Sequence, residues 1–257
     1  YHDRAMHKSA RLSAILEQLA TSGTVDVSGL AKELAASPAT IRRDLAALER
    51  QRLLARTHGG AVAHAVSYEL PLRYKGVRYA EEKRRIAEAA VALMSEGMAV
   101  GLTGGTTATE VARALPDRQQ LTIVTNALNI ASELGVRPNI KLIVTGGLAR
   151  NQSYELSGPI AEASLAGLNL DIAFIGVDGV DAKAGCTTHE EVEAHTNSVM
   201  IAHARRVVLV ADHSKIGRVT FARICEATAV DELISDTGAD AAAVKALSDA
   251  GVHVTLV

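Results

Sequence analysis

Two short groups of residues in this chain could bind a negatively charged partner. Arg42 and Arg43 are adjacent, and a guanidinium can bind a guanine edge or a phosphate through two hydrogen bonds. Much later, Gly104 and Gly105 stand between threonines in the run 102–107. Glycines let the backbone approach a ligand closely, and the helix expected to follow offers unpaired N–H groups, which suits a phosphate. The first group indicates nucleic acid and the second a small anion.

The arginine pair stands at the start of a predicted helix. Ser37 is a good N-cap, and Pro38 suits the first helical position because its missing N–H would be unpaired there. Ile41, Leu45 and Leu48 recur at helical spacing and are expected to face a core. The exposed N-terminal end of such a helix is the part that reads the major groove in a helix-turn-helix. An ordinary amphipathic helix with solvated arginines is the alternative.

A basic hairpin follows this helix. Residues 53–56 and 61–63 can pair as short strands, and the glycines between them permit a tight turn. Arg56 and His58 would then lie beside the phosphate backbone. Helices over 11–19 and 28–34 are predicted to precede the recognition helix. The predicted DNA contacts are Ser37, Pro38, Ala39, Thr40, Arg42, Arg43, Arg56 and His58.

Beyond this head the chain alternates between apolar, β-rich runs and helical stretches. The predicted strands are 98–102, 121–125, 140–145, 170–177, 206–211, 229–234 and 252–257. The predicted helices are 81–94, 107–115, 127–134, 159–168, 190–203 and 240–250. The alternation predicts an α/β sheet, mostly parallel, with helices on both faces. Domains are therefore expected over 6–63 and 81–257, with an ordered linker over 64–80.

Polar residues follow the carboxyl ends of several of these strands. Open α/β sheets bind their ligands at these ends. Thr125 and Asn126 end one strand, and Gly146 and Gly147 follow another. The loop at 102–107 could by itself be a tight turn without a ligand. Three strand ends of this kind favour an anion site. Asp178, Glu193 and Lys215 could add hydrogen bonds to sugar hydroxyls and to a phosphate.

Composition limits the class of protein. The chain has 257 residues, 48% of them hydrophobic, and it contains two cysteines. It has no membrane-length apolar run and no secretory signal, and two cysteines fit a reducing cytoplasm. Residues 1–64 carry nine basic and six acidic residues, whereas the rest carries 18 basic and 23 acidic ones. A basic head on an acidic body fits a DNA-binding protein. His189 and Glu193 lack a third ligand, so no metal site is expected.

A family resemblance adds to these interpretations. Ser-Pro-Ala-Thr-Ile-Arg-Arg-Asp-Leu at 37–45, followed by Arg-Thr-His-Gly-Gly-Ala at 56–61, resembles the N-terminal signature of the DeoR family of bacterial transcriptional regulators. The stretch from Lys83 through Asp236 resembles the effector domain of that family, which is similar to ribose-5-phosphate isomerase. The resemblance implies a winged helix-turn-helix joined to a domain that senses phosphorylated sugars. The effector-binding residues expected from the loops and the resemblance are Lys83, Thr103, Gly104, Gly105, Thr106, Thr107, Thr125, Asn126, Gly146, Gly147, Asp178, Glu193 and Lys215.

The chain departs from the isomerase at the residues that transfer protons. Ile175 stands where the first catalytic aspartate is expected, and Gly185 and Cys186 stand where a lysine is expected. An aldose–ketose isomerase needs a positioned base and a charge for its enediolate. Asn197 stands where members of the family often carry Lys.

We therefore expect a cytoplasmic regulator and not an enzyme. It would repress a sugar catabolic operon, bind operator DNA as a homodimer or homotetramer, use no cofactor, and leave the DNA when it binds a sugar phosphate. The alternative is a phosphosugar isomerase or deacylase with a DNA-binding appendage.

Overall fold

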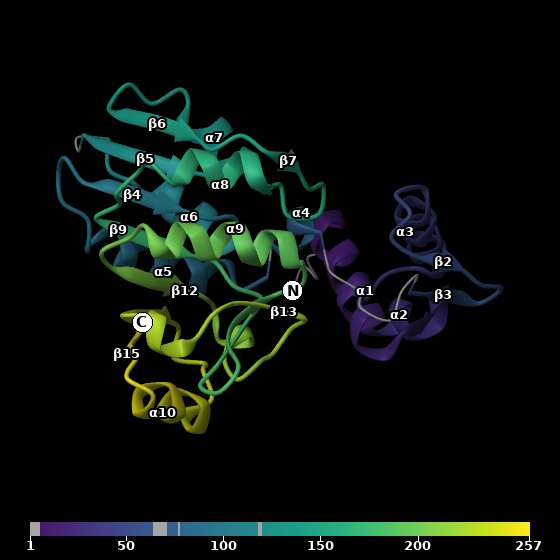
Figure 1. Ribbon diagram of the computed structural model, residues 1–257. Coiled ribbons are helices and arrows are strands. Elements are labelled where there is room, and N and C mark those ends of the chain that lie inside the picture. The colour runs from purple at the N-terminus through teal and green to yellow at the C-terminus, as the bar shows by residue number, and fades with distance from the viewer. Residues whose placement is uncertain (1–5, 64–70, 77, 118–119) are drawn as a thin grey trace. The chain divides into compact units, whose positions relative to one another are not determined.

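The computed structural model describes residues 6–63, 71–76, 78–117 and 120–257 (Figure 1). The chain divides into two compact units, residues 1–78 and residues 79–257. Each unit is described by itself.

The N-terminal unit is a winged helix-turn-helix, as predicted. Its elements are α1 (Lys8–Ser22), β1 (Thr24–Asp26), α2 (Val27–Glu33), α3 (Pro38–Arg50), β2 (Ala55–Arg56), β3 (Gly60–Val62) and α4 (Leu72–Lys75). Ile15 and Leu16 of α1 pack with Ile41, Leu45 and Leu48 of α3 in one buried core. The apolar face that helical spacing predicts for α3 is therefore the face it buries.

The wing is a three-stranded antiparallel sheet in the order β1-β3-β2. The predicted hairpin supplied only two of these strands, β2 and β3. The third strand, β1, lies before α2 in the chain and pairs with β3. Gly60 is required by this pairing and not by turn geometry. An ideal Cβ on Gly60 would lie 1.8 Å from the carbonyl oxygen of Val25, so a side chain there would separate β3 from β1.

Part of the segment predicted as a linker belongs to the N-terminal unit. Residues 72–75 form α4, and Tyr74 is buried in the same core as α1 and α3. The Tyr74 hydroxyl donates to Gln51 Oε1 at 2.6 Å, and Ser13 Oγ donates to the Tyr74 carbonyl at 2.6 Å. The prediction of a separate linker over 64–80 is therefore wrong for this helix, whose single turn is too short to show a period. Residues 64–70 and 77 lie outside the described residues.

The C-terminal unit is built on a seven-stranded sheet in which every neighbouring pair is parallel. Its order is β15-β14-β12-β9-β4-β5-β6. The strands are β4 (Ala99–Leu102), β5 (Leu121–Thr125), β6 (Ile140–Val144), β9 (Ile172–Ile175), β12 (Val207–Val210), β14 (Glu232–Ser235) and β15 (His253–Leu256). Each of the seven runs predicted as strands supplies one of them.

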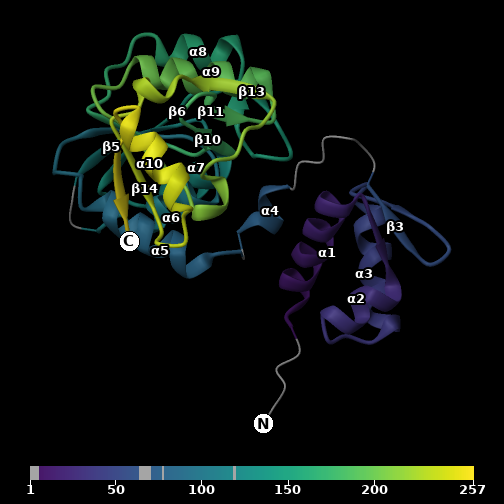
Figure 2. The ribbon, with the colours of Figure 1, turned by 90° about the horizontal axis from the view of Figure 1, so that it is seen from below.

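Helices cover both faces of this sheet (Figures 1 and 2). They are α5 (Ala80–Val91), α6 (Thr106–Ala114), α7 (Leu128–Leu134), α8 (Pro159–Leu165), α9 (Glu191–Ala202) and α10 (Ala241–Asp249). The side chains of strand β9 pack on both faces of the sheet. Phe174 packs in the cluster that contains residues of α5, α6 and α7, whereas Ala173 and Ile175 pack in the cluster with α8, α9 and α10. Successive side chains of a strand point to opposite faces, and both faces here are buried.

The sheet has a topological switch point between β4 and β9. From β4 the chain proceeds outward through β5 to β6, and then returns to place β9 on the other side of β4. The loops after β4 and β9 therefore leave the carboxyl edge of the sheet in opposite directions. Such a point opens a crevice, and open α/β sheets bind their ligands there.

Five short strands were not predicted. They are β7 (Leu148–Ala149), β8 (Leu156–Ser157), β10 (Gly179–Asp181), β11 (Gly185–Thr188) and β13 (Ala222–Cys225). The first two form a hairpin, and the other three form an antiparallel sheet in the order β10-β11-β13. Runs of two to four residues are too short to show a period of two. In the second sheet Cys186 lies directly opposite Cys225, and both thiols are free.

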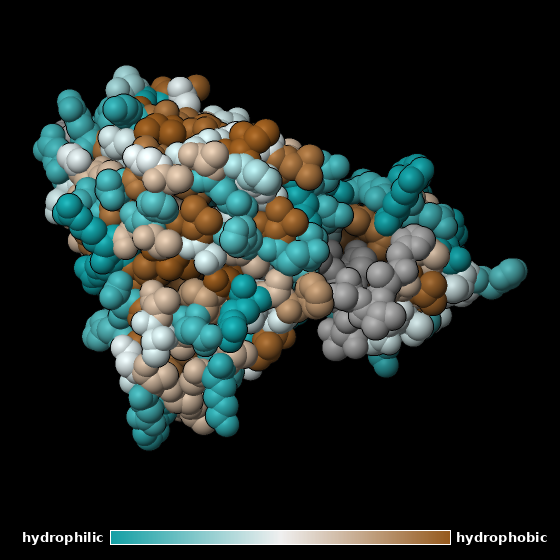
Figure 3. Space-filling model, viewed as in Figure 1, coloured by the Kyte–Doolittle hydropathy of each residue, from teal (hydrophilic) through white to brown (hydrophobic). Residues whose placement is uncertain are grey.

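Apolar side chains also reach the surface of the C-terminal unit. Figure 3 shows apolar groups on the face that α8 and α9 cover, where Ile160 and Val192 are exposed. Among the described residues, no helix is both long enough and apolar enough to span a membrane.

Candidate functional site

The first site is the N-terminal end of α3. Ser37 caps this helix, since its Oγ accepts from the Thr40 N–H at 3.1 Å, and Pro38 occupies the first turn. Arg42 and Arg43 are exposed and form no ion pair with any residue that the structure describes. Their charges are therefore available to a partner. The cap, proline and arginine pair lie together as predicted, with Ala39 exposed beside them.

The opposite side of α3 is held by an ion pair that the sequence did not indicate. Asp44 is buried, and Arg11 Nε of α1 donates to its Oδ2 at 2.5 Å. Asp44 looks like part of a polar run in the sequence, because nothing in the run 42–44 marks one residue as interior. The pair fixes α3 against α1, so the arginines before Asp44 are held toward solvent.

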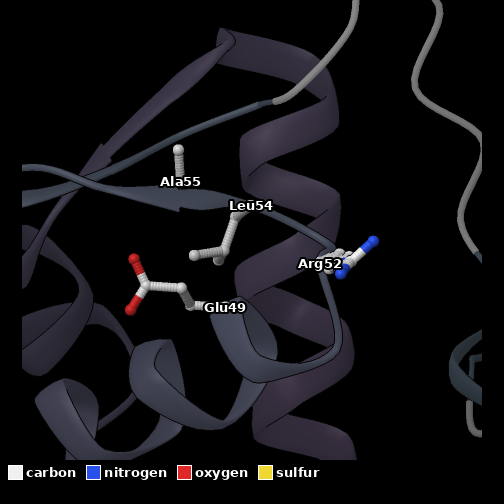
Figure 4. Close-up of a pocket in the computed structure, with 4 residues that line it drawn as sticks. All are labelled: Glu49, Arg52, Leu54 and Ala55. Atoms are coloured by element: carbon white, nitrogen blue, oxygen red, sulfur yellow. The ribbon is translucent and has the colours of Figure 1, made fainter.

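In the wing, Arg56 ends β2 and His58 lies in the turn before β3, and both residues are exposed. Arg56 lies 3.8 Å from Glu49 of α3, in an ion pair whose side chains are each about two-fifths exposed. This exposed pair is weak, and it leaves Arg56 able to exchange Glu49 for a phosphate. A depression of about 480 Å³ opens between the end of α3 and β2 (Figure 4). It is lined by Glu49, Arg52, Leu54 and Ala55.

The second site begins with the loop between β4 and α6. Gly105 has a φ of 111° and precedes α6, whose first turn has no side-chain cap and no acidic residue. The first N–H groups of α6 are thus not bonded by a capping side chain, which suits an anion. Thr103 is fully buried, and its Oγ1 accepts from the Gly176 N–H at 2.8 Å. This bond ties the loop after β4 to the loop after β9 across the switch point.

The loop lies against a carboxyl group that the sequence analysis did not select. An ideal Cβ on Gly104 would lie 2.4 Å from Glu155 Oε1, so only glycine fits beside this carboxyl. Glu155 precedes β8, which crosses the carboxyl edge of the sheet. The side-chain amides of Asn126 and Asn197 each donate to its Oε2 at 3.1 Å. Burial raises the pKa of Glu155 to about 8, with the negative charges of Glu193 and Asp178 adding to the rise.

Two further predicted acids lie near this carboxyl, each with a cation. Asp178 follows β9 and lies 3.4 Å from Lys215 Nζ, and it also accepts from Thr188 Oγ1 at 3.1 Å. Glu193 of α9 is buried and lies 3.4 Å from Arg150 Nη1, and it accepts a short hydrogen bond from Ser153. The structure thus joins Gly104, Asn126, Asp178 and Glu193 in one cluster centred on Glu155.

Other predicted site residues are placed differently. Thr125 is fully buried, and its Oγ1 donates to the Leu102 carbonyl at 2.7 Å, so this hydroxyl is used inside the sheet. Gly147 packs on β8, since a Cβ there would lie 2.7 Å from the Ser157 carbonyl, and Gly146 packs against Ile160. Lys83 of α5 is buried and lies 3.8 Å from Asp212, which follows β12. Thr106 and Thr107 occupy the first turn of α6.

Sequence reasoning missed Arg150, Ser153 and Glu155 because they lie between the short strands β7 and β8. Their only signal was local polarity in the run 150–155. Asn197 was noted as a departure, and the structure gives it a partner in Glu155. Ile175 and Cys186, which replace expected catalytic residues, are fully buried in the core. Among the described residues, no group of three or more His, Cys, Asp or Glu is arranged to hold a metal ion.

Comparisons with known proteins cover both units. Residues 11–65 match the model of the DeoR-like helix-turn-helix domain, and residues 78–237 match that of the DeoR C terminal sensor domain. The chain is 38% identical to the HTH-type transcriptional regulator GlpR of Haloferax volcanii, over 97% of this chain and 98% of that protein. It is 31% identical to the glycerol-3-phosphate regulon repressor of Escherichia coli K12, over 98% and 100% of the two chains.

Solved structures give weaker matches. A ribose 5-phosphate isomerase A from Methanocaldococcus jannaschii matches with 21% identity and a TM-score of 0.37, covering 53% of this chain and 54% of that one. The sorbitol operon regulator SorC from Klebsiella pneumoniae matches with 14% identity and a TM-score of 0.38, covering 85% and 97%. Both matches are too weak to support a conclusion about function. The two family models and the full-length relatives identify the family, and the chain belongs to the DeoR family of DNA-binding transcriptional regulators.

Proposed function

We propose that this chain is a cytoplasmic repressor of genes for sugar catabolism and that a phosphorylated sugar releases it from operator DNA. The observation that carries the proposal is the uncapped start of α6, which follows a two-glycine loop at the switch point of a parallel sheet. The name of one relative, the glycerol-3-phosphate regulon repressor, supports a phosphorylated small molecule as the effector.

In this proposal the phosphate binds at the N–H groups of Thr106 and Thr107, and Lys215 supplies a positive charge. Lys215 would then share its charge between the phosphate and Asp178, which lies 3.4 Å from it. Asp178 and Glu193 would accept hydrogen bonds from sugar hydroxyls. The phosphate should dominate affinity, because charge-assisted hydrogen bonds are the strongest contacts that such a site offers.

The proposal also requires more than one copy of the chain. A single short recognition helix reads too few base pairs to select one operator in a genome. We therefore propose that a homodimer or homotetramer binds the DNA. The effector must bind the DNA-free state better than the DNA-bound state, or it would shift nothing. Sedimentation of the protein with and without operator measures the number of copies.

Gel-shift titration tests the effector site. The DNA is selected from a random-sequence pool by the wild-type protein, and the effectors are sugar phosphates and their unphosphorylated parents. Phosphate esters should release the DNA at far lower concentrations than the parent sugars. Lys215→Ala and Thr106→Asp should bind DNA normally and require more effector for release, and Lys245→Ala, an exposed lysine of α10, is the control. If both site variants release DNA at the wild-type effector concentration, the phosphate binds elsewhere.

A turnover assay separates this function from isomerase activity. Isomerisation needs a base and a charge near the reacting carbons, whereas Ile175 and Cys186 offer neither. Ribose 5-phosphate should therefore bind without conversion. Formation of ribulose 5-phosphate in proportion to protein, and lost on Asp178→Ala, would overturn the assignment as a regulator.

A further inference from the structure

One carboxyl oxygen of Glu155, Oε1, accepts no hydrogen bond from the described residues. Both amide donors, from Asn126 and Asn197, reach the same oxygen, Oε2. Within the described ranges no donor reaches Oε1, although the residue is only 7% exposed. A carboxyl oxygen that accepts no hydrogen bond from the protein is available to a ligand.

A second open acceptor belongs to Asn126, whose amide nitrogen donates to the other oxygen of Glu155. Asn126 is fully buried, and its Oδ1 has no hydrogen-bond partner among the residues the structure describes. The orientation of this amide is set by its nitrogen, which donates to Glu155 Oε2 and to Asn197 Oδ1, each at 3.1 Å. Turning the amide over would place oxygen against oxygen. The site therefore presents one buried acceptor, Asn126 Oδ1, and one carboxyl oxygen, Glu155 Oε1, that no N–H group of the described residues reaches.

Glu155 also differs from its two acidic neighbours in its ion pairs. Asp178 has Lys215 within 3.4 Å, and Glu193 has Arg150 within 3.4 Å. Glu155 forms no ion pair with any cation in the described part of the chain, and its charged neighbours are the acids Glu193 and Asp178. Of the three carboxyls, Glu155 is the one without a cation within ion-pair distance among the described residues. Donors without charge are already supplied by the two asparagines.

The open oxygen lies close to the expected phosphate. Glu155 Oε1 would be 2.4 Å from a Cβ on Gly104, and Gly104 and Gly105 form the loop that opens α6. A small molecule held by its phosphate at α6 would therefore have its other substituents beside Glu155. One ligand of the size of a sugar phosphate can reach both places.

We propose that the effector carries a primary ammonium group in addition to its phosphate, as a phosphorylated amino sugar does, and that Glu155 Oε1 and Asn126 Oδ1 bind this ammonium. The inference rests on the proposed function, because it assumes that a phosphorylated sugar occupies the site. An ammonium supplies three donors and one positive charge, which match Glu155 Oε1, Asn126 Oδ1 and the one carboxyl of the cluster that has no cation beside it. Binding would convert Glu155 to its carboxylate and release its proton.

Matched ligand pairs test the proposal by titration calorimetry with the full chain. The 2-amino-2-deoxy 6-phosphates of glucose, galactose and mannose are compared with the corresponding hexose 6-phosphates, which differ only in a hydroxyl for the ammonium. At least one amino ester should bind on the order of tenfold tighter than its hydroxyl partner, as a charge-assisted bond predicts. Its N-acetyl derivative, which has no charge, should lose the gain.

The variant Glu155→Gln keeps the shape and the bonds from the two asparagines and removes the charge. It should still bind the hydroxyl ester, which shows that it folds, and should lose the preference for the amino ester. Glu133→Gln, in an exposed ion pair with Arg113, should keep the preference. Titration in two buffers of different ionisation enthalpy should show proton release for the amino ester with wild type and not with Glu155→Gln.

The outcomes separate the inference from the proposed function. Equal affinity of amino and hydroxyl esters in every pair would overturn the inference and leave the sugar-phosphate site standing. The same holds if the preference survives in Glu155→Gln. Failure of every phosphate ester to bind would overturn both.

Discussion

Arg11 of α1 and Asp44 of α3 form an ion pair at 2.5 Å, with side chains that are 12% and 4% exposed. The pair joins the first helix of the N-terminal unit to the inner side of the recognition helix. Arg42 and Arg43 immediately precede Asp44, so this contact sets which way these two arginines face.

Asp44→Asn should therefore destabilise the N-terminal unit by about 3–5 kcal/mol, because it leaves the buried guanidinium without a counter-charge. Hydrogen exchange of the amides of α1 and α3 in the full chain measures the loss. Glu81→Gln breaks an exposed pair with Arg84 and should cost less than about 1 kcal/mol. A similar small loss for Asp44→Asn would mean that the ion pair does not hold α3 in place.

Arg42→Ala and Arg43→Ala should each weaken operator binding by about 1–3 kcal/mol. The reason is that each removes a charge-assisted contact to a base or a phosphate. Fluorescence anisotropy with the selected operator gives the affinities, and titration with the effector should show unchanged ligand binding. Arg84→Ala, which removes an exposed arginine from the other unit, is the control. Wild-type affinity in both α3 variants would refute the assignment of this helix to the major groove.

Stability should depend on pH through Glu155. Its pKa is about 8 in the folded protein, against about 4.3 in an unfolded chain. Between these values the folded protein holds a proton that the unfolded chain has lost. This stabilisation is complete below about pH 4, and it is lost as the pH rises through 8.

Urea unfolding of wild type and Glu155→Gln across this pH range measures the effect. Wild type should lose more unfolding free energy than the variant as the pH rises, because glutamine does not titrate. Glu133→Gln should follow the wild-type slope. Parallel curves for wild type and Glu155→Gln would show that Glu155 has an ordinary pKa.

The two free cysteines should differ in reactivity. A hydrogen bond between the thiols raises the pKa of Cys186, with burial adding to the rise, and lowers the pKa of Cys225. Since the thiolate is the nucleophile, iodoacetamide should modify Cys225 first in the folded protein. Peptide mass mapping after timed labelling checks this order, and Cys186→Ala should slow the labelling of Cys225. Faster labelling of Cys186 would contradict the assignment of the donor.

The sequence by itself determined the elements whose signals are local. The cap at Ser37, the proline after it and the spacing of Ile41, Leu45 and Leu48 identify the recognition helix, because capping and helical periodicity act within a few residues. The seven strands of the parallel sheet were predicted as well, since strands buried on both faces appear as continuous apolar runs. The family resemblance followed from the residues around Arg42 and from the hairpin sequence at 56–61.

Only the tertiary structure decided what the polar residues do. Arg11 and Asp44 are 33 positions apart, and Asn126 and Glu155 are 29 apart. No local pattern marks such partners, since burial and pairing depend on how separate elements pack. Glu155 has the same side chain as the exposed Glu81, and its raised pKa and open oxygen arise only because β8 crosses the edge of the sheet beside Gly104. A carboxyl takes its chemistry from its surroundings, and those are assembled only when the chain folds.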